Sequence, residues 1–485
     1  MMISFLQINM VLQRCSSSTC SIRSKSTAAF GNYVKELVKD KVLDEAAKPD
    51  SKFWAESHSS TRNRIHSIDE ERNSVYSNGK QRQLNDHLDP EFPASRTDHE
   101  HSNDDIDDTT TDHYLTHDPL QDWHLDERPR GVRLSLPSNV RPLEHGTDPF
   151  QLAQAEIKLV TEGIRRDLIG SDHPVLNKAA AYFFDDEAGG KKVRPVMVML
   201  LSKAMAASSS KWMSAEESER ILRSQRRLAQ ISEMIHTASL FHDDVIDNAD
   251  TRRNKPAVHR VFGDKMAILA GDYLLARASI YLARLRNVEV VETMSTIIEH
   301  LVRGEVMQMK QPAASPNSHI TPQMEYYLRK NFYKTASLMA NSCKSAAILG
   351  QHYDQGLIQS AYLYGKHVGL AFQLADDIMD FNVSNAANMG KPALSDLSSG
   401  IATAPVIFAS EEHPQLHDMI RRKFRQDGDV EKALELVEQS RGMERSVELA
   451  EVHAELAIDA VLELDNGPYR DSLVHLACKV VNRTR

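Results

Sequence analysis

The sequence predicts an all-α protein in which a single helical-bundle domain, residues 148–485, follows a largely disordered N-terminal extension. Three observations lead to this prediction. Apolar residues recur at helical spacing in six long segments of the domain. Glycine and proline concentrate between those segments, where they interrupt the helical pattern. Convincing alternating strand patterns are absent, so the 485 residues are expected to build one helical domain although their number would allow more.

The six predicted helical segments follow one another along the chain. They are Ile157–Ile169, Leu228–Val245, Met266–Leu285, Val290–Met309, Glu325–Leu349 and Leu357–Phe381. Breakers lie between them, at Gly189-Gly190, from Pro312 to Pro322 and from Gly390 to Pro392. Because residues three and four apart share one helix face, each segment can bury an apolar stripe against its neighbours.

Residues 1–35 contain no acidic residue, and they carry four basic side chains, a run of serines and scattered apolar residues. This composition is typical of an organelle transit peptide, with a merely disordered N-terminus as the alternative. In residues 36–147 the polar types Asp, His, Ser, Asn and Arg come to dominate, most clearly from Pro49 to Pro142. Such a segment buries too little apolar surface to offset the entropy of ordering, so we predict a disordered, solvated extension.

Bulk composition excludes several classes of function. A formal net charge of -10 disfavours a broad phosphate-binding surface, so we expect no nucleic acid partner. No uninterrupted apolar run reaches the roughly 18–20 residues of a membrane-spanning helix. The four cysteines lack the paired spacing of a zinc site or a disulfide framework, which fits a reducing compartment. They are Cys15, Cys20, Cys343 and Cys478.

Two acidic clusters end long apolar helical stretches. They are Asp243-Asp244-Val245-Ile246-Asp247 and Asp376-Asp377-Ile378-Met379-Asp380. Positions i and i+4 are neighbours on a helix, so Asp243 faces Asp247 and Asp376 faces Asp380. Carboxylates this close repel one another and are costly to desolvate, which predicts a compensating cation. Clusters of oxygen ligands suit Mg²⁺, which commonly bridges to substrate phosphates.

A single such cluster is often only a solvated acidic helix end, but two on different apolar helices are harder to explain in that way. Metal ions held between them would stabilise a diphosphate leaving group, on which negative charge develops. Basic residues recur at motif-like positions and can hold diphosphates beside the metal. They lie in Gly189-Gly190-Lys191-Lys192-Val193-Arg194-Pro195, at Arg252 and Arg253, at Lys334-Thr335 and at Gly390-Lys391-Pro392.

At these positions the chain resembles the trans-isoprenyl diphosphate synthases. GGKKVRP matches the family's GGKxxRP, and EMIHTASLFHDDVIDNADTRR matches its first aspartate-rich region. LVRGEVMQM, YYLRKNFYKTASLMANSCK, FQLADDIMDF and GKPALSDLSSGIATAP follow in the family's order. The match covers essentially all of Asp148–Arg485, and with DPFQLAQAEIKLV it is most similar to mitochondrial long-chain (solanesyl or decaprenyl) polyprenyl diphosphate synthases.

The resemblance implies the isoprenoid synthase fold, a helical bundle around a central active-site cavity. It also implies a role for each matched residue. Isopentenyl diphosphate would bind Lys191, Arg194, His236 and Arg253. The allylic diphosphate would bind Arg252, Lys334, Thr335, Gln373 and Lys391. Mg²⁺ would bind Asp243 and Asp247 with support from Asp244, and a further Mg²⁺ would bind Asp376, Asp377 and Asp380. Asn254 departs from the family's usual glycine, but asparagine tolerates left-handed backbone geometry.

The implied reaction is ionisation to an allylic cation, attack by the isopentenyl double bond and loss of a proton, with released diphosphate as the base. The resemblance thus predicts a prenyltransferase that extends farnesyl or geranylgeranyl diphosphate to the precursor of the ubiquinone side chain. Together with the acid-free leader it indicates a mitochondrial location, in the matrix or at the inner membrane. A homodimer is the expected assembly, and a heteromer is the alternative.

Two small residues precede the first acidic cluster and bear on product length. Ser239 and Ala238 lie four and five residues before Asp243, about 6–7 Å deeper along the helix axis. An aromatic side chain there would block a growing tail, so the resemblance implies a long product of about eight to ten isoprene units. The alternative is that both are packing residues at a helix crossing. Burial of a long apolar tail predicts slow release, peripheral membrane contact and turnover that responds to lipid vesicles.

Four alternatives remain open from the sequence. A class I terpene cyclase shares the architecture, but it needs no second diphosphate site and would leave GGKKVRP and Arg253 without a purpose. A non-catalytic regulatory subunit would not be expected to retain all six aspartates, since buried charges are costly without metal and substrate. A shorter-chain synthase and a catalytic subunit that needs a partner chain are the other two.

Overall fold

The computed structural model describes residues 134, 136–143, 148–168, 173–184, 192–209, 214–253, 255–310, 320–351, 354–381 and 394–484. All of them belong to one compact unit, Ile106–Arg485. The predicted transit peptide, residues 1–35, and nearly all of the predicted extension, residues 36–147, lie outside the described residues, so both stay predictions.

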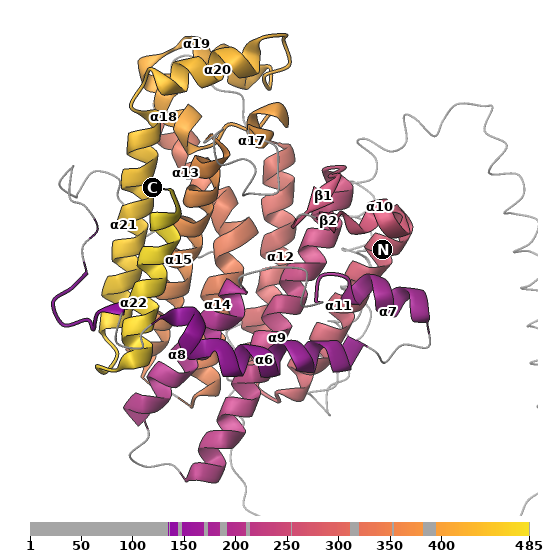
Figure 1. Cartoon of the computed structure of the whole chain (residues 1–485), viewed down its shortest axis with the longest axis vertical. Helices are drawn as coiled ribbons and strands as arrows, with labels where there is room; N and C mark the ends of the chain where they lie inside the picture. Colours follow the sequence, from indigo (N-terminus) through magenta and orange to yellow (C-terminus); the bar gives the residue numbers. More distant parts are fainter. Residues whose placement is uncertain are drawn as a thin grey trace, which may run out of the picture. The chain divides into compact units, whose positions relative to one another are not determined.

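The described chain is a bundle of α-helices (Figure 1). Its first helices are α6 (Pro149–Leu168), α7 (Pro174–Ala181), α8 (Val193–Ser209), α9 (Ala215–Ile246), α10 (Val258–Phe262), α11 (Asp264–Arg284) and α12 (Val288–Met309). They are followed by α13 (Ile320–Asn331), the π-helical turn η4 (Phe332–Ala336), α14 (Ser337–Leu349), α15 (Gln355–Asp380), α17 (Ser395–Ser398), α18 (Ala404–Glu412), α19 (Gln415–Arg421), α20 (Asp429–Glu438), α21 (Gly442–Leu462), α22 (Pro468–Val481) and the 3₁₀ turn η6 (Asn482–Thr484). Between α9 and α10, the two-residue strands β1 (Thr251–Arg252) and β2 (Lys255–Pro256) pair antiparallel.

The predicted all-α fold is confirmed, and the predicted helical segments match α6, α9, α11, α12, α13 to α14, and α15 to within one residue at their C-terminal ends. Helices α6 and α9 begin well before their predicted starts, and one predicted helix is interrupted. Helix α9 begins well before Leu228, because Ser214 caps it by accepting a hydrogen bond from the Glu217 N–H at 3.2 Å. The apolar stretch Glu325–Leu349 is helical throughout, but the π-helical turn η4 interrupts the α-helix within it.

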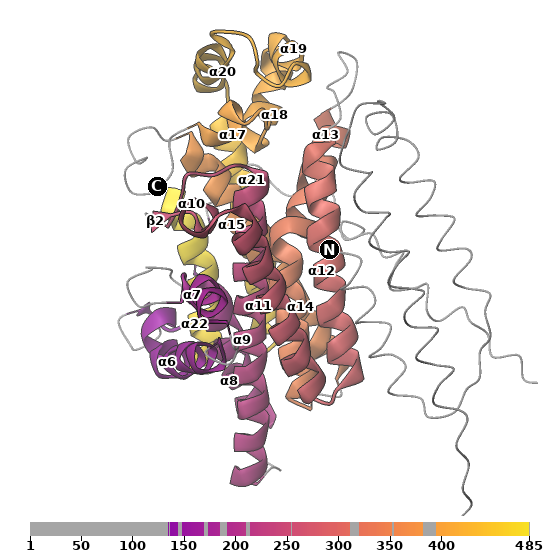
Figure 2. The same ribbon diagram turned by 90° about the vertical axis from the view of Figure 1, so that its right-hand side faces the viewer.

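Helix α15 lies at the centre of the bundle, between α14 and α21, while α9 packs along α11 (Figures 1 and 2). The chain crosses closely at Gly369 of α15. A Cβ atom there would lie 2.5 Å from the Cα of Ala336, so only glycine lets α15 approach the π-helical turn. This approach brings two functional segments, η4 and the end of α15, side by side.

One described helix, α11, is long and apolar enough to cross a membrane by length and composition alone. It includes Asp272 and Arg277, and both make polar contacts within the bundle. The Asp272 carboxylate lies 3.6 Å from His242 of α9, and the Arg277 guanidinium donates to the Tyr281 hydroxyl at 3.0 Å. In this structure α11 is therefore a packing partner of α9.

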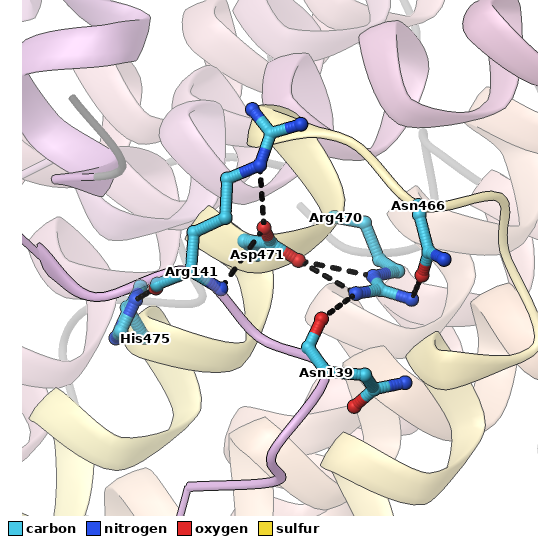
Figure 3. Close-up of polar contacts among 6 residues, drawn as sticks. All are labelled: Asn139, Arg141, Asn466, Arg470, Asp471 and His475. Atoms are coloured by element: carbon cyan, nitrogen blue, oxygen red, sulfur yellow. Dashed lines mark hydrogen bonds and ion pairs between the residues drawn. The ribbon is translucent and has the colours of Figure 1, made fainter. Parts of the chain in front are cut away.

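Residues 136–143, which the sequence assigned to the extension, lie against α22 (Figure 3). We call this segment the clasp. Arg470 of α22 donates to the Asn139 carbonyl at 2.9 Å, and the Arg141 N–H donates to Asp471 at 3.2 Å. His475 contacts the Arg141 carbonyl at 2.7 Å. Arg470 and Asp471 also pair with each other at 2.8 Å with side chains only 2% exposed, so the folded part of the chain begins before residue 148.

Replacing Arg470 by Met is expected to destabilise the protein by about 3–5 kcal/mol, because Asp471 would stay buried without its main cation. The measurement is the thermal unfolding midpoint of the purified protein. Arg441→Met is the control, since Arg441 pairs with Glu444 on an exposed surface and should leave the midpoint unchanged. Equal midpoints for Arg470→Met and the unaltered protein would show that the contacts of Arg470 contribute nothing to stability.

Candidate active site

The first aspartate region lies at the C-terminal end of α9 and the second at the C-terminal end of α15. Most buried residues of the two helices are apolar or small, and the acidic residues come in the last turns of each helix. The elements that follow them, β1 and β2 after α9 and α17 after α15, lie toward the same end of the bundle in both views (Figures 1 and 2). The structure thus brings the two regions to one end of the fold.

In the first region the three aspartates have different surroundings. Asp247 is exposed, whereas Asp243 is partly buried. Burial raises the pKa of Asp243 to about 6, and the negative charges of Glu305 and Asp247 act in the same direction. The cations Lys334 and Arg252 oppose this rise. Burial is therefore the main cost of charging Asp243, and Lys334 and Arg252 offset part of it.

Asp244, the middle residue of the first region, is fully buried and held by a cation. Arg252 of β1 donates to its Oδ1 through Nε at 2.8 Å and through Nη2 at 2.5 Å. The other oxygen, Oδ2, has no hydrogen-bond partner among the described residues. Because the β1–β2 hairpin carries Arg252 back onto the helix that precedes it, Asp244 fixes the position of this arginine. Arg252 was predicted to bind the allylic diphosphate, and the structure places it beside the first region.

In the second region, Asp380 and Asp377 are both tied to neighbouring protein groups. Asp380 accepts hydrogen bonds from the Ser395 N–H and hydroxyl at 3.1 and 2.9 Å, and from the Asp396 N–H at 3.1 Å. Asp377 accepts from the Tyr327 hydroxyl at 2.6 Å and from the Gln373 amide at 2.8 Å. Burial raises the pKa of Asp377 above its ordinary value. Asp380 therefore anchors the start of α17, and Asp377 orients Gln373.

A group of cations lies near both regions. Burial lowers the pKa of Arg194 to about 10, and the charges of Glu233, Arg253 and Asp376 also act on this guanidinium. Burial and three arginines, Arg194 first among them, hold the pKa of His236 well below its usual value. Its imidazole is therefore neutral at physiological pH. Arg194, His236 and Arg253, which the resemblance assigned to isopentenyl diphosphate, come together here, while Lys191 lies outside the described residues.

The predicted allylic diphosphate residues on η4 and α15 also come together. The Lys334 ammonium donates to Glu305 at 2.6 Å and to Gln308 at 2.9 Å, and its charge acts on Asp243. Thr335 donates to the Gln373 side chain at 2.8 Å. A Cβ atom at Gly304 of α12 would lie 2.6 Å from the Lys334 side chain, so glycine lets this lysine cross α12. Lys391 lies outside the described residues.

Among the described residues, no three His, Cys, Asp or Glu side chains are close enough to hold one metal ion. The two regions meet instead through the cations that lie near both, such as Arg194, whose pKa responds to Asp376 and to Glu233 of α9. Mg²⁺ is usually held by one or two carboxylates together with water and substrate phosphates. In such a site, oxygen atoms of the substrate complete the set of metal ligands. The carboxylates of the two aspartate regions fit this pattern.

The two residues of α9 that were predicted to bear on product length differ in their exposure. Ala238 is fully buried, whereas Ser239 is partly exposed and donates to the His236 carbonyl at 2.9 Å. Ser239 is four residues before Asp243 and so shares its helix face. A small open pocket lies elsewhere, beside α13, α18 and α19. Its lining includes Tyr327 and Lys330, which lie behind Asp377.

Several residues of the site were not singled out from the sequence. Tyr327 donates to Asp377, Glu305 pairs with Lys334, and Arg483 of η6 pairs with Asp376 at 3.2 Å. Tyr327 and Glu305 fall inside the motifs YYLRKNFYKTASLMANSCK and LVRGEVMQM, so those motifs carried a signal for them. Arg483 lies in no motif, and its contact with Asp376 spans 107 residues.

Known proteins with this architecture and these motifs form one class, the enzymes that join isoprenoid diphosphates. The family model of polyprenyl synthetases matches residues 173–437, more than half of the 485-residue chain. The chain belongs to the polyprenyl synthetase family. The predicted family and the predicted prenyltransferase activity class are thereby confirmed.

Named relatives share most of their length with this chain. A probable mitochondrial hexaprenyl pyrophosphate synthase of Neurospora crassa is 43% identical over 373 residues, covering 70% of this chain and 82% of that protein. Solanesyl-diphosphate synthase 1 of Oryza sativa subsp. japonica, also mitochondrial, is 41% identical over 352 residues, covering 70% and 80%. The predicted mitochondrial location is confirmed by these relatives. Their names are those of long-chain synthases, as the resemblance implied.

Solved structures agree with the fold. A polyprenyl synthase of Caulobacter crescentus, complexed with calcium and isoprenyl diphosphate, superposes with a TM-score of 0.61 at 27% identity, covering 72% of this chain and 100% of that chain. A decaprenyl diphosphate synthase of Rhodobacter capsulatus superposes with a TM-score of 0.60 at 28% identity, covering 70% and 98%. The family thus uses divalent metal ions and isoprenoid diphosphates.

Replacing Asp243 by Asn is expected to stabilise the metal-free protein near pH 7.5. The folded pKa of Asp243 is about 6 against an ordinary 3.8, so its contribution to stability is fully present below pH 3.8 and is lost as pH rises through 6. The gain from Asp243→Asn should be about 1–3 kcal/mol at pH 7.5 and should shrink toward pH 4.

Unfolding midpoints at the two pH values, with chelator present, check this expectation. Asp250→Asn is the matched control, because the Asp250 side chain is 86% exposed and its loss should give no such gain. A gain for Asp243→Asn that is equal at both pH values would contradict the assigned cause.

Proposed function

We propose that this chain is a Mg²⁺-dependent synthase that adds isopentenyl diphosphate units to an allylic primer, farnesyl or geranylgeranyl diphosphate. The product is a long polyprenyl diphosphate, the precursor of the ubiquinone side chain. One observation carries the proposal: two aspartate regions end at one end of the bundle, with Lys334, Arg194 and Arg252 between or beside them. That arrangement supplies opposite charge for both a metal and two diphosphates.

The residues fit a hard divalent cation. Asp243 is under-compensated, Asp247 is exposed, and one oxygen of buried Asp244 has no partner among the described residues. Carboxylate oxygens are the ligands that Mg²⁺ prefers. When bound, Mg²⁺ would neutralise diphosphate oxygens and stabilise the charge that develops on the leaving group.

The aspartates divide into two groups by their contacts. Asp244 is held by Arg252. Asp377 is held by Tyr327 and Gln373, and Asp380 is held by groups at the start of α17. Asp243, Asp247 and Asp376 lie at the more open positions of the two regions. We assign direct metal contact to this second group and a supporting role to the first.

Each diphosphate has its own set of protein groups. Arg194, His236 and Arg253 would bind isopentenyl diphosphate, together with Lys191. The neutral imidazole of His236 can donate an N–H without adding to the repulsion among the arginines. Lys334, Thr335, Gln373 and Arg252 would bind the allylic diphosphate, together with Lys391.

The reaction follows from this geometry. The allylic carbon–oxygen bond breaks, and its electron pair leaves with the diphosphate, whose charge Lys334 and Arg252 help to offset. The isopentenyl double bond supplies the electrons of the new carbon–carbon bond. A proton is then lost from the carbon next to the cation, with the released diphosphate as its acceptor.

Alanine in place of Asp243 or Asp376 is expected to lower kcat on the order of 10³-fold, because charge stabilisation at the leaving group is lost. The assay extracts product from farnesyl diphosphate and labelled isopentenyl diphosphate with the purified chain alone. Asp250→Ala should retain full activity, since Asp250 lies on an exposed loop.

The same preparation separates the alternatives. Product formed from farnesyl diphosphate without isopentenyl diphosphate would indicate a cyclase, and an inactive chain would indicate a regulatory subunit or a missing partner. Its mass by light scattering tests the proposed homodimer. Exposed apolar residues on α11 and α12, such as Leu269, Ile280 and Val288, offer a surface for a second copy.

Product length depends on the space below the first aspartate region. We propose that the tail grows along α9 past Ser239 and Ala238, where small side chains leave room. Phe at position 238 or 239 is expected to shorten the main product by several isoprene units with farnesyl diphosphate as primer. Each lost unit removes several buried CH₂ groups, at about 0.8 kcal/mol for each.

Chromatography of the dephosphorylated products measures the length. Ser239→Phe is the cleaner test, because Ser239 is partly exposed whereas Ala238 is fully buried and Phe there can disturb packing. Ser279→Phe on α11, also partly exposed, serves as the control of equal volume change. Unchanged product length in an active Ser239→Phe protein would refute the open path.

A further inference from the structure

Arg483, in the turn η6 that follows α22, reaches the second aspartate region. Its Nη2 lies 3.2 Å from Asp376 Oδ1. Its guanidinium also lies over the Phe372 ring, 4.3 Å from the centroid, and its Nε donates to the Val480 carbonyl at 3.2 Å. Because Phe372 and Asp376 are four residues apart on α15, they share one helix face. Three contacts therefore direct this arginine at Asp376.

The helix that presents Arg483 is fixed at several points along its length. Arg470 and Asp471 join its start to the clasp, and Lys479 pairs with Asp148 at 2.5 Å. Helix α22 also packs on α21, α8 and α15. The position of Arg483 is thus set by the body of the bundle.

Asp376 differs from its two neighbours in the kind of contact it makes. Asp377 and Asp380 are held by neutral donors, the Tyr327 hydroxyl, the Gln373 amide and the groups at the start of α17. Asp376 is paired with a full positive charge.

We propose that Arg483 is a positioning residue of the second aspartate region, which neutralises Asp376 in the metal-free enzyme and competes with the divalent cation for that carboxylate. The inference rests on the proposed metal contact of Asp376. The pair is partly exposed, 25% for Arg483 and 38% for Asp376, and such pairs are weak enough to be displaced. Metal binding and formation of the Arg483–Asp376 pair are linked equilibria. Bound metal weakens the pair by some factor, and removing the arginine must strengthen metal binding by the same factor.

The test measures the affinity for Mn²⁺ alone, by electron paramagnetic resonance of the free ion, without substrate. Arg483→Gln is expected to bind Mn²⁺ roughly two- to fivefold more tightly, and Arg483→Lys is expected to stay near the unaltered protein. In an Asp376→Asn background, Arg483→Gln should change nothing, because the competing contact is already gone. Unchanged or weaker Mn²⁺ binding by a folded Arg483→Gln protein would overturn the proposal.

Arg445 provides a matched control. It pairs with Glu411, lies 4.3 Å from the centroid of the Phe408 ring and has a side chain 26% exposed, but neither contact involves an aspartate of the two regions. Arg445→Gln should leave Mn²⁺ affinity unchanged. A rise in affinity equal to that of Arg483→Gln would show that the effect of Arg483→Gln comes only from the change in net charge.

Two failures can be told apart with the Asp376→Asn protein. If that variant keeps full Mn²⁺ binding and activity, the proposed metal contact of Asp376 is wrong, and this inference falls with it. If Asp376→Asn loses both while Arg483→Gln binds Mn²⁺ as the unaltered protein does, only the inference about Arg483 is wrong.

Discussion

The site depends on an electrostatic imbalance, the concentration of six carboxylates where two apolar helices leave the core. Such a concentration of like charge is unfavourable unless cations or hydrogen-bond donors are built around it. The fold supplies them from distant segments: Arg252 returns on a hairpin, Lys334 crosses α12, and Tyr327 reaches across from α13. Some negative charge, chiefly that of Asp243, is not fully compensated by these groups. A metal that also holds a diphosphate can bind to it.

Close helix packing converts this charge pattern into a site of defined geometry. Helix α15 approaches the π-helical turn through Gly369, and the turn then offers Lys334 toward α9 and Thr335 toward Gln373. A regular α-helix would rotate these adjacent side chains differently, which is a common reason for π-helical turns at functional sites. The hydrogen bonds from Thr335 to Gln373 and from Gln373 to Asp377 join η4 to the second aspartate region.

Much of the fold and of the candidate site could be predicted from the sequence, because both depend on the spacing of residues that are close together in the chain. Apolar periodicity predicted the long helices, and the spacing of Asp243 with Asp247 and of Asp376 with Asp380 predicted paired carboxylates at helix ends. Other features have no local signal. Tyr327 meets Asp377 across 50 residues, and Arg470 meets Asn139 across 331 residues, so both contacts are products of the fold. The π-helical turn was missed because its residues continue the same apolar pattern as the helices around it.

The clasp has a consequence for how shortened versions of the protein should be cut. Leu134 and Val140 pack against the core, and the main chain at Asn139 and Arg141 supplies acceptors for two buried side chains of α22. A recombinant version that starts at the first helix, Pro149, would keep every motif and yet leave Arg470 and His475 without these acceptors. Expression trials should therefore begin upstream of Leu134.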